Sequence, residues 1–282
     1  MKGMSRSFFS QNHRLVIVYA VITFVGLLSL SLLLKPVLSH FLKDEILVEL
    51  LAGSMARLAV CGAGLLFIIK ADLTEFLGLG KRRPENLQAL IIPLTIVGGV
   101  IVGGFETYTS APVVLLLFFI LKQLLVAMAE ELFFRGIVLP KFILLAEGYK
   151  NGLILSVVLT SVIFGLLHFI NLIRQPDNLY GITTQVIFAT SMGIFLAGLF
   201  LRTRSISIPI LFHFLFNVAF GNSELKPNDV STATEIGARD PSLSSFILTL
   251  SFFAFIAIGG IYMIGTVDRQ LLFNTLKNND SI

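Results

Sequence analysis

The chain has 282 residues, of which 55% are hydrophobic and only 13% are charged. This composition excludes an ordinary soluble domain, because several runs of about 20 apolar residues indicate membrane-spanning helices. The formal net charge of +4 gives no indication of a nucleic-acid partner, and a single cysteine, Cys61, excludes an intrachain disulfide and a thiolate metal cluster.

Eight apolar segments predict eight membrane-spanning helices. They are Leu15–Leu34, Ile46–Ile69, Leu87–Gly104, Val113–Leu139, Leu153–Ile173, Tyr180–Leu201, Ile206–Phe220 and Phe246–Ile264. The first segment is too long for the core of a signal peptide, so we expect it to remain as a helix. The sequence therefore predicts an all-α, multi-pass integral membrane protein.

The basic residues divide unequally between the two sets of loops, which should lie on opposite sides of the membrane. One set, together with the N- and C-terminal segments, holds 13, and these are Lys2, Arg6, Arg14, Lys70, Lys81, Arg82, Arg83, Lys141, Lys150, Arg202, Arg204, Arg269 and Lys277. The opposite set holds 5, and these are Lys35, Lys43, Arg174, Lys226 and Arg239. Because cytoplasmic loops carry the excess of Lys and Arg, we expect both termini in the cytoplasm.

The connection between the second and third segments, Ala71 to Glu85, ends in the basic run Lys81-Arg82-Arg83. We expect an interfacial loop whose basic residues face anionic lipid headgroups. The longest polar loop, Gly221 to Ser245, is rich in Ser, Thr, Asn and Asp. No internal repeat and no soluble domain is indicated.

The fourth segment contains two adjacent carboxylates and an arginine, Glu130, Glu131 and Arg135, in surroundings that are otherwise apolar. Ionisable groups at membrane depth are costly, so such a cluster indicates a functional site. Glu131 and Arg135 are four residues apart and share one helix face, where they can pair. Glu130 lies about 100° around the helix without that partner, which leaves it free to react.

Two later segments place histidine among apolar residues. The fifth contains Phe164 and His168, and the seventh contains His213 and Asn217, which are four apart and project from one helix face. A buried histidine is more often a hydrogen-bonded core residue than a catalyst. Inside a membrane, however, polar groups must find partners within the bundle, so a site shared by the three helices is the simplest explanation.

The expected depths of the polar residues below the membrane surface agree for only two of these helices. Glu130 and His168 lie about 25 Å and 27 Å along their helices from the turn at 147–150, whereas His213 lies only about 13 Å past Arg204. Either the hairpin of the fourth and fifth segments projects beyond the bilayer, or the seventh helix begins deep, near Pro209.

The residue types fit peptide-bond hydrolysis without a serine or cysteine nucleophile. A carboxylate and a histidine can deprotonate water in a dry site, while a second histidine and an asparagine can donate to a developing oxyanion. The alternative is that Glu130, His168 and His213 hold Zn²⁺, which typically takes three protein ligands and a water. The H-E-x-x-H motif of zinc proteases is absent.

The three motifs E-E-x-x-x-R, F-x-x-x-H and H-x-x-x-N occur in this order at Glu130–Arg135, Phe164–His168 and His213–Asn217. This pattern resembles the CAAX-protease and bacteriocin-processing (CPBP, or Abi) family of intramembrane proteases, which includes the Ras-converting CAAX endopeptidase. The resemblance covers about Leu124 to Phe220.

The resemblance implies an eight-helix intramembrane endopeptidase with its catalytic cavity inside the bundle. Glu130 would activate water together with His168, and His213 and Asn217 would stabilise the oxyanion. Glu131, Arg135 and Phe164 would be supporting residues. The family has been described both as metalloproteases and as glutamate proteases that need no metal; we favour the glutamate mechanism, with no cofactor, and keep Zn²⁺ as the alternative.

On this interpretation residues 1–110 supply helices one to three, residues 111–222 form the catalytic core, and residues 223–282 supply a polar loop and the last helix. We expect a bacterial plasma membrane, contacts with lipid and a peptide or lipidated protein substrate. Two other functions stay open: a non-proteolytic scaffold or bacteriocin-immunity protein of the same fold, and a proton-coupled transporter, although the paired halves typical of transporters are not visible.

Overall fold

The computed structural model describes residues 12–78, 91–173, 175–225 and 243–280, and these residues are helical, with no strand among them. Six helical stretches are long and apolar enough to cross a membrane. They are α2 (His13–Phe41), α3 (Glu45–Lys70), α6 with η2 and α7 (Val113–Leu145), α8 with η3 (Gly152–Ile173), α9 (Leu179–Thr203) and α12 (Leu243–Gly265). The protein is thus an all-helical, multi-pass membrane protein in its described part.

The remaining described elements are shorter. They are α4 (Ile91–Gly103), α5 (Phe105–Ser110), α10 (Ser207–Phe220), η4 (Asn222–Leu225) and α13 (Arg269–Asp280). An apolar helix thus occupies each of the eight predicted positions. Helix α10 has only 14 residues, and α4 has 13 residues within the described range, which begins at its first residue. Several predicted features lie outside the described residues: the N-terminal segment to residue 11, the start of the third segment at Leu87, the run Lys81–Arg83, and Arg174, Lys226 and Arg239.

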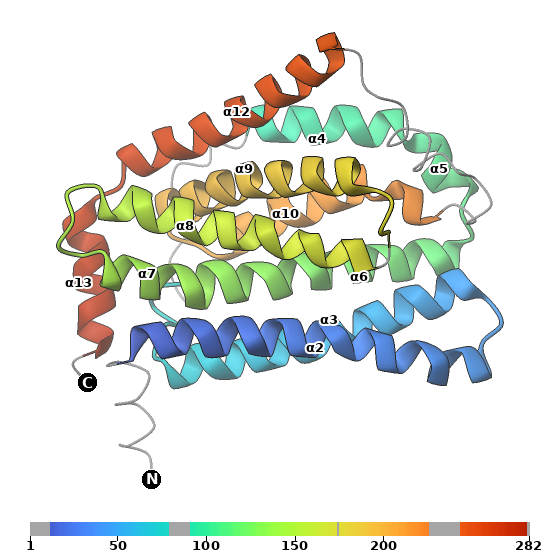
Figure 1. Ribbon diagram of the computed structural model, residues 1–282, viewed down its shortest axis with the longest axis horizontal. Coiled ribbons are helices and arrows are strands. Elements are labelled where there is room, and N and C mark those ends of the chain that lie inside the picture. The colour runs from blue at the N-terminus through green and yellow to red at the C-terminus, as the bar shows by residue number, and fades with distance from the viewer. Residues whose placement is uncertain (1–11, 79–90, 174, 226–242, 281–282) are drawn as a thin grey trace.

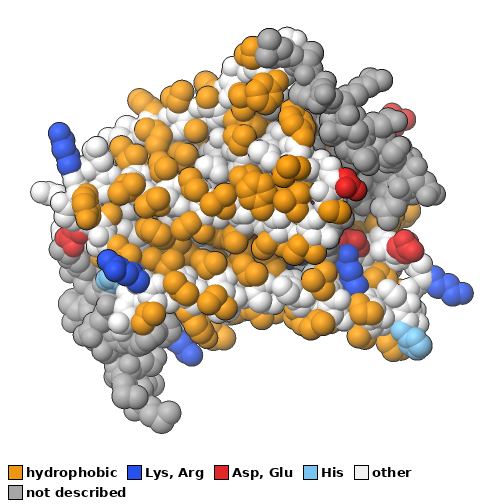
Figure 2. All heavy atoms as spheres, viewed as in Figure 1, with side chains coloured by type: hydrophobic (Ala, Val, Ile, Leu, Met, Phe, Trp, Pro, Cys, Tyr) orange, Lys and Arg blue, Asp and Glu red, His pale blue; other side chains and the backbone are white. Residues whose placement is uncertain are grey.

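Helix α6 is central, with α3 against one side and α10 against the other (Figure 1). Helix α9 packs between α8 and α12, and α2 packs along α3. Figure 2 shows hydrophobic side chains over most of one face, while the charged side chains gather toward the two ends. This distribution suits a bundle whose sides meet lipid and whose ends meet water.

Small residues allow α9 to approach its neighbours closely. A Cβ atom on Gly193 would lie 2.8 Å from the Cβ of Ser161 in α8, and one on Gly198 would lie 2.5 Å from the carbonyl oxygen of Gly260 in α12. Membrane helices gain most of their association energy from such packing, because lipid tails are as apolar as the helices themselves. The glycines therefore set the position of α9, and with it the wall of the candidate site.

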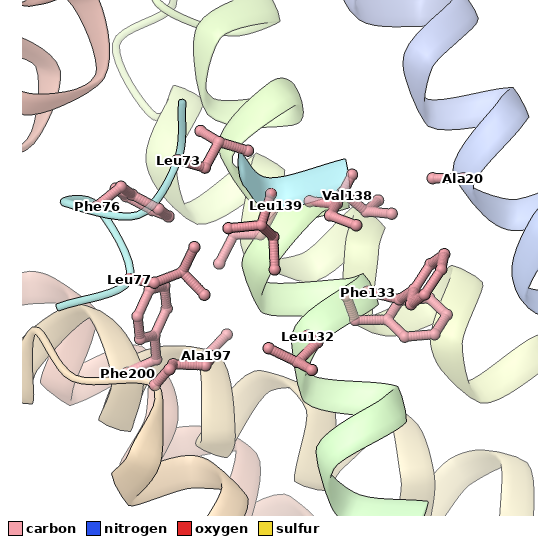
Figure 3. Packing of buried hydrophobic residues seen from close by; sticks show 14 of the residues in the cluster. Ala20, Leu73, Phe76, Leu77, Leu132, Phe133, Val138, Leu139, Ala197 and Phe200 are labelled. Carbon is pink, nitrogen blue, oxygen red and sulfur yellow. The ribbon is translucent and has the colours of Figure 1, made fainter. Parts of the chain in front are cut away.

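The first part of the predicted interfacial loop, residues 71–78, is instead part of the core. Leu73, Phe76 and Leu77 are buried and pack against α7 and α9 (Figure 3). The carbonyl of Leu77 accepts a hydrogen bond from the amide of Ile206 at 3.0 Å. Burial of the three apolar side chains holds this part of the loop against the helices. The basic run Lys81–Arg83, which we expect to face lipid headgroups, lies outside the described residues.

The start of α10 is buried inside the protein. The α9–α10 connection, residues 203–206, contains buried Thr203, Ser205 and Ile206, whereas the α7–α8 turn at 147–150 is exposed. Segment 71–78 covers the connection from outside. Helix α10 therefore begins deep in the protein, beneath this segment.

Two features near the same end differ from the sequence-based expectation. Lys141 was assigned to a loop, but the helix continues through α7 to Leu145 and Lys141 is 1% exposed. After α12 the chain forms α13, an amphipathic helix that buries Leu272 and Leu276 against the core and packs on α7. The pattern analysis did not identify this helix.

Candidate functional site

The carboxylate pair lies where the α-helical hydrogen bonding of the fourth segment changes. Helix α6 ends at Phe133 and is followed by one π-helical turn, η2 (Phe134–Val138), before α7 begins at Leu139. Pro140 has no amide hydrogen to donate four residues back, which suits this departure from α-helical hydrogen bonding. Single π-turns inside α-helices frequently occur at functional sites.

The predicted pairing of Glu131 with Arg135 is confirmed. Arg135 Nη1 donates to Glu131 Oε1 at 2.7 Å, and the side chains are 3% and 0% exposed. Arg135 Nη2 also donates to the carbonyl of Gly193 at 3.0 Å, and the guanidinium lies 5.2 Å from the ring centroid of Phe164. The arginine thus ties α6 to α8 and α9.

Glu131 has a second partner that the sequence analysis did not foresee. His213 Nδ1 lies 2.8 Å from Glu131 Oε1, and His213 Nε2 lies 3.4 Å from Glu130 Oε2. Arginine, carboxylate, imidazole and carboxylate therefore form one continuous series, Arg135–Glu131–His213–Glu130. When Glu131 is ionised it can only accept hydrogen bonds, and Nδ1 is then the donor, while Nε2 is directed at Glu130.

Glu130 differs from Glu131 in its surroundings. Its side chain is 17% exposed, whereas that of Glu131 is completely buried. Glu130 therefore retains access to water, and it makes no contact with Arg135 that would fix it as an ion pair. This is the asymmetry that the helix spacing predicted.

His168 approaches the same region from α8. Its Nδ1 lies 3.2 Å from the carbonyl oxygen of Phe164, at the point where α8 gives way to the 3₁₀ helix η3. The Phe164 ring packs edge-on against the rings of His168 and His213, with centroid distances of 5.2 and 6.2 Å. Phe164 thus connects the two histidines, and within the described residues no hydrogen bond joins His168 to Glu130 directly.

Asn217 follows His213 by one turn of α10. Its amide nitrogen Nδ2 is buried and has no hydrogen-bond partner. A buried amide donor without a partner destabilises the folded protein, so it indicates a group that donates a hydrogen bond to a ligand or substrate. Glu131 Oε2 is a second buried atom without a partner at this site.

The alternative zinc ligands are not brought together. Across the described ranges, no three His, Cys, Asp or Glu side chains are grouped so that they could hold a metal ion. Glu130, His168 and His213 therefore do not form a coordination set in this arrangement.

Two further polar residues of α6, Lys122 and Gln123, are buried between helices. Lys122 Nζ lies 2.5 Å from Glu224 Oε2, which ties η4 to α6 just beyond the end of α10. The signal for these residues was present in the sequence, since they are the only polar interruptions between Val113 and Ala127. Their partners could not be inferred because Glu224 lies 102 positions from Lys122.

Comparison with known proteins gives one match. Residues 112–219 match a family model described as Type II CAAX prenyl endopeptidase Rce1-like. No curated protein and no solved structure matches the chain. The matched range includes all the site residues on α6, η2, α8, η3 and α10. Residues 112–219 of this chain are therefore an Rce1-like type II CAAX prenyl endopeptidase (CPBP) family domain.

Proposed function

We propose that the protein is an intramembrane endopeptidase in which Glu130, assisted by His168, activates a water molecule for attack on a peptide bond. The family match indicates protease activity. Two observations support the proposal. His213 Nε2 contacts Glu130, which is partly accessible, and the buried Nδ2 of Asn217, one helical turn after His213, has no hydrogen-bond partner among the described residues.

In the proposed reaction the water transfers a proton to Glu130 and its oxygen attacks the substrate carbonyl carbon. His213 Nε2 and Asn217 Nδ2 donate to the oxyanion that forms. Because Nδ1 donates to Glu131, His213 can donate from Nε2 only when both of its ring nitrogens carry protons. The C–N bond then breaks, and the proton held by Glu130 passes to the departing amine.

The supporting residues have distinct roles in this scheme. Arg135 compensates the buried charge of Glu131, and Glu131 in turn orients the His213 ring. Phe164 fixes the spacing of the two histidines. This arrangement resembles the general pattern in which a buried carboxylate holds a catalytic imidazole in one orientation.

We propose that all eight apolar helices lie in the membrane, including α4 and the short α10, with both termini in the cytoplasm of a bacterial cell. The excess of basic residues at that side supports this topology. Residues 111–222 would form the catalytic core inside the bundle, while residues 1–110 and 223–282 enclose it. The substrate would be a peptide or a lipidated protein segment presented from the bilayer.

The test is cleavage of internally quenched peptides, with and without a prenylated cysteine, by the purified protein. Glu130→Ala should abolish cleavage without loss of folded protein. Glu106→Ala, the same change at an exposed residue of α5, is the control and should cleave as the parent does. Equal activity in Glu130→Ala and the parent would refute Glu130 as the base, and absence of cleavage by the parent would favour the scaffold function.

A further inference from the structure

Gln123 lies on the same face of α6 as the proposed base. It precedes Glu130 by seven residues, so it is displaced by about 20° around the helix and about 10 Å along it. Its side chain is 4% exposed, and its Nε2 atom is buried without a hydrogen-bond partner. The proposed reaction gives this residue no role.

The amide of Gln123 is directed at the seam between α6 and α10. A Cβ atom on Gly221, the residue that ends α10, would lie 3.3 Å from Gln123 Nε2 and 3.6 Å from the Phe119 ring. Since Gly221 is eight residues beyond His213, and His213 contacts Glu130, α10 runs antiparallel to α6 along this seam. Gln123 therefore sits in the same interface as the site, two helical turns away.

Asn217 occupies the intermediate position. It lies about 6 Å along α10 from His213, while Gln123 lies about 10 Å along α6 from Glu130. Both residues present a buried amide nitrogen without a partner among the described residues, and the Phe119 ring lies beside Gly221 in the same seam. A seam that only held the helices together would be more stable with apolar residues at both positions.

We propose that the Gln123 side-chain amide binds the substrate backbone about three residues from the scissile bond. An extended peptide advances about 3.3 Å per residue, so a chain with its scissile carbonyl beside Glu130 and Asn217 places an oxygen near Gln123 after about three residues. That oxygen is a peptide carbonyl or a terminal carboxylate. Because the amide is buried, the proposal requires α10 to move away from α6 beside Gly221 when the peptide binds. The inference rests on the proposed protease function.

The experiment compares the parent with Gln123→Leu, which preserves size and removes the amide. Gln185→Leu is the matched control, because Gln185 is exposed on α9 and pairs with Asn171 instead. Each protein is given quenched peptides in which one backbone carbonyl at a time, up to four residues on either side of the scissile bond, is replaced by a methylene group. Peptides shortened from either end test whether Gln123 binds the terminal carboxylate instead of a peptide carbonyl.

For unmodified peptides, Gln123→Leu should lower kcat/KM by about three- to tenfold, the usual worth of one hydrogen bond between such groups. With the peptide that lacks the oxygen bound by Gln123, about three residues from the scissile bond, Gln123→Leu and the parent should have equal kcat/KM. With the other modified peptides, the difference between the two proteins should persist. Gln185→Leu should show no loss. The thermal unfolding midpoint of Gln123→Leu should equal or exceed that of the parent, since a buried unpaired donor is removed.

The outcomes separate this inference from the proposed function. If Glu130→Ala is inactive but Gln123→Leu cleaves every peptide as the parent does, the inference fails and the protease function stands. A fall in the unfolding midpoint of Gln123→Leu, with an equal loss of activity on all peptides, would show a structural role and also overturn the inference. If the parent cleaves none of the peptides, both proposals fail together.

Discussion

Replacement of Arg135 by alanine tests the buried ion pair most directly. The change removes the guanidinium that pairs with Glu131, together with the hydrogen bond to the Gly193 carbonyl and the contact with the Phe164 ring. Glu131 is completely buried, so water cannot solvate its carboxylate when Arg135 is removed. Breaking a buried pair by removing one partner costs about 3–5 kcal/mol.

The lower end of that range applies here, because His213 Nδ1 remains as a donor to Glu131 Oε1. A loss of about 3 kcal/mol corresponds to a fall of roughly 5 °C in the unfolding midpoint for a chain of this size. Arg135→Lys keeps the charge but has no planar fork to reach both Glu131 and Gly193, so it should fall between alanine and the parent.

The assay can use Cys61, which is the only cysteine and is buried in α3. A thiol-specific fluorogenic maleimide reacts with this buried thiol only after unfolding. The unfolding midpoint of the detergent-solubilised protein can therefore be measured without introducing another cysteine. Arg14→Ala, at an exposed position of α2, is the control.

Addition of Glu131→Gln to Arg135→Ala provides the decisive comparison. If the loss arises from a stranded charge, neutralising Glu131 should recover part of it. An Arg135→Ala midpoint within about 2 °C of the parent, or no recovery in the double variant, would show that the ion pair does not carry the stability assigned to it.

Four further predictions follow from the same geometry. Gly78→Ala should destabilise the protein severely, because Gly78 has φ +64° and its new Cβ would clash with the carbonyl oxygen of Arg204. Gly62→Ala, with open space around the new Cβ, should be neutral or stabilise the protein by about 1 kcal/mol. Equal unfolding midpoints for the two variants would contradict the burial of segment 71–78. Gly193→Ala should lower the midpoint by pushing α9 from α8, and Ser161→Gly should restore part of it; failure of that rescue would refute the contact. Lys122→Met should destabilise the protein by stranding Glu224, but by less than Arg135→Ala because Glu224 is 38% exposed, and thermal unfolding tests that order. Cleavage activity should survive prolonged treatment with a strong chelator; loss of activity that Zn²⁺ restores would instead require a metal mechanism.

Much of the candidate site was readable from spacing along single helices. The interval of four between Glu131 and Arg135 predicted their ion pair, and the interval of one between Glu130 and Glu131 predicted that they would differ in environment. Helical periodicity fixes such relations locally, so they do not depend on how the helices are arranged. The same locality explains why the apolar runs were identified while the end of the fourth one was not, since the helix continues past Leu139 through Lys141 to Leu145.

The relations between helices were decided only by the tertiary structure. No periodicity states that His213 will reach Glu131, 82 positions away, or that Lys122 will meet Glu224. These contacts depend on the depth at which α10 begins, and that depth depends on segment 71–78, whose Leu73, Phe76 and Leu77 are buried over the α9–α10 connection. The sequence alone determined which polar groups enter the apolar bundle; the packing of apolar side chains determined which of them meet, because burial energy acts between segments regardless of their separation along the chain.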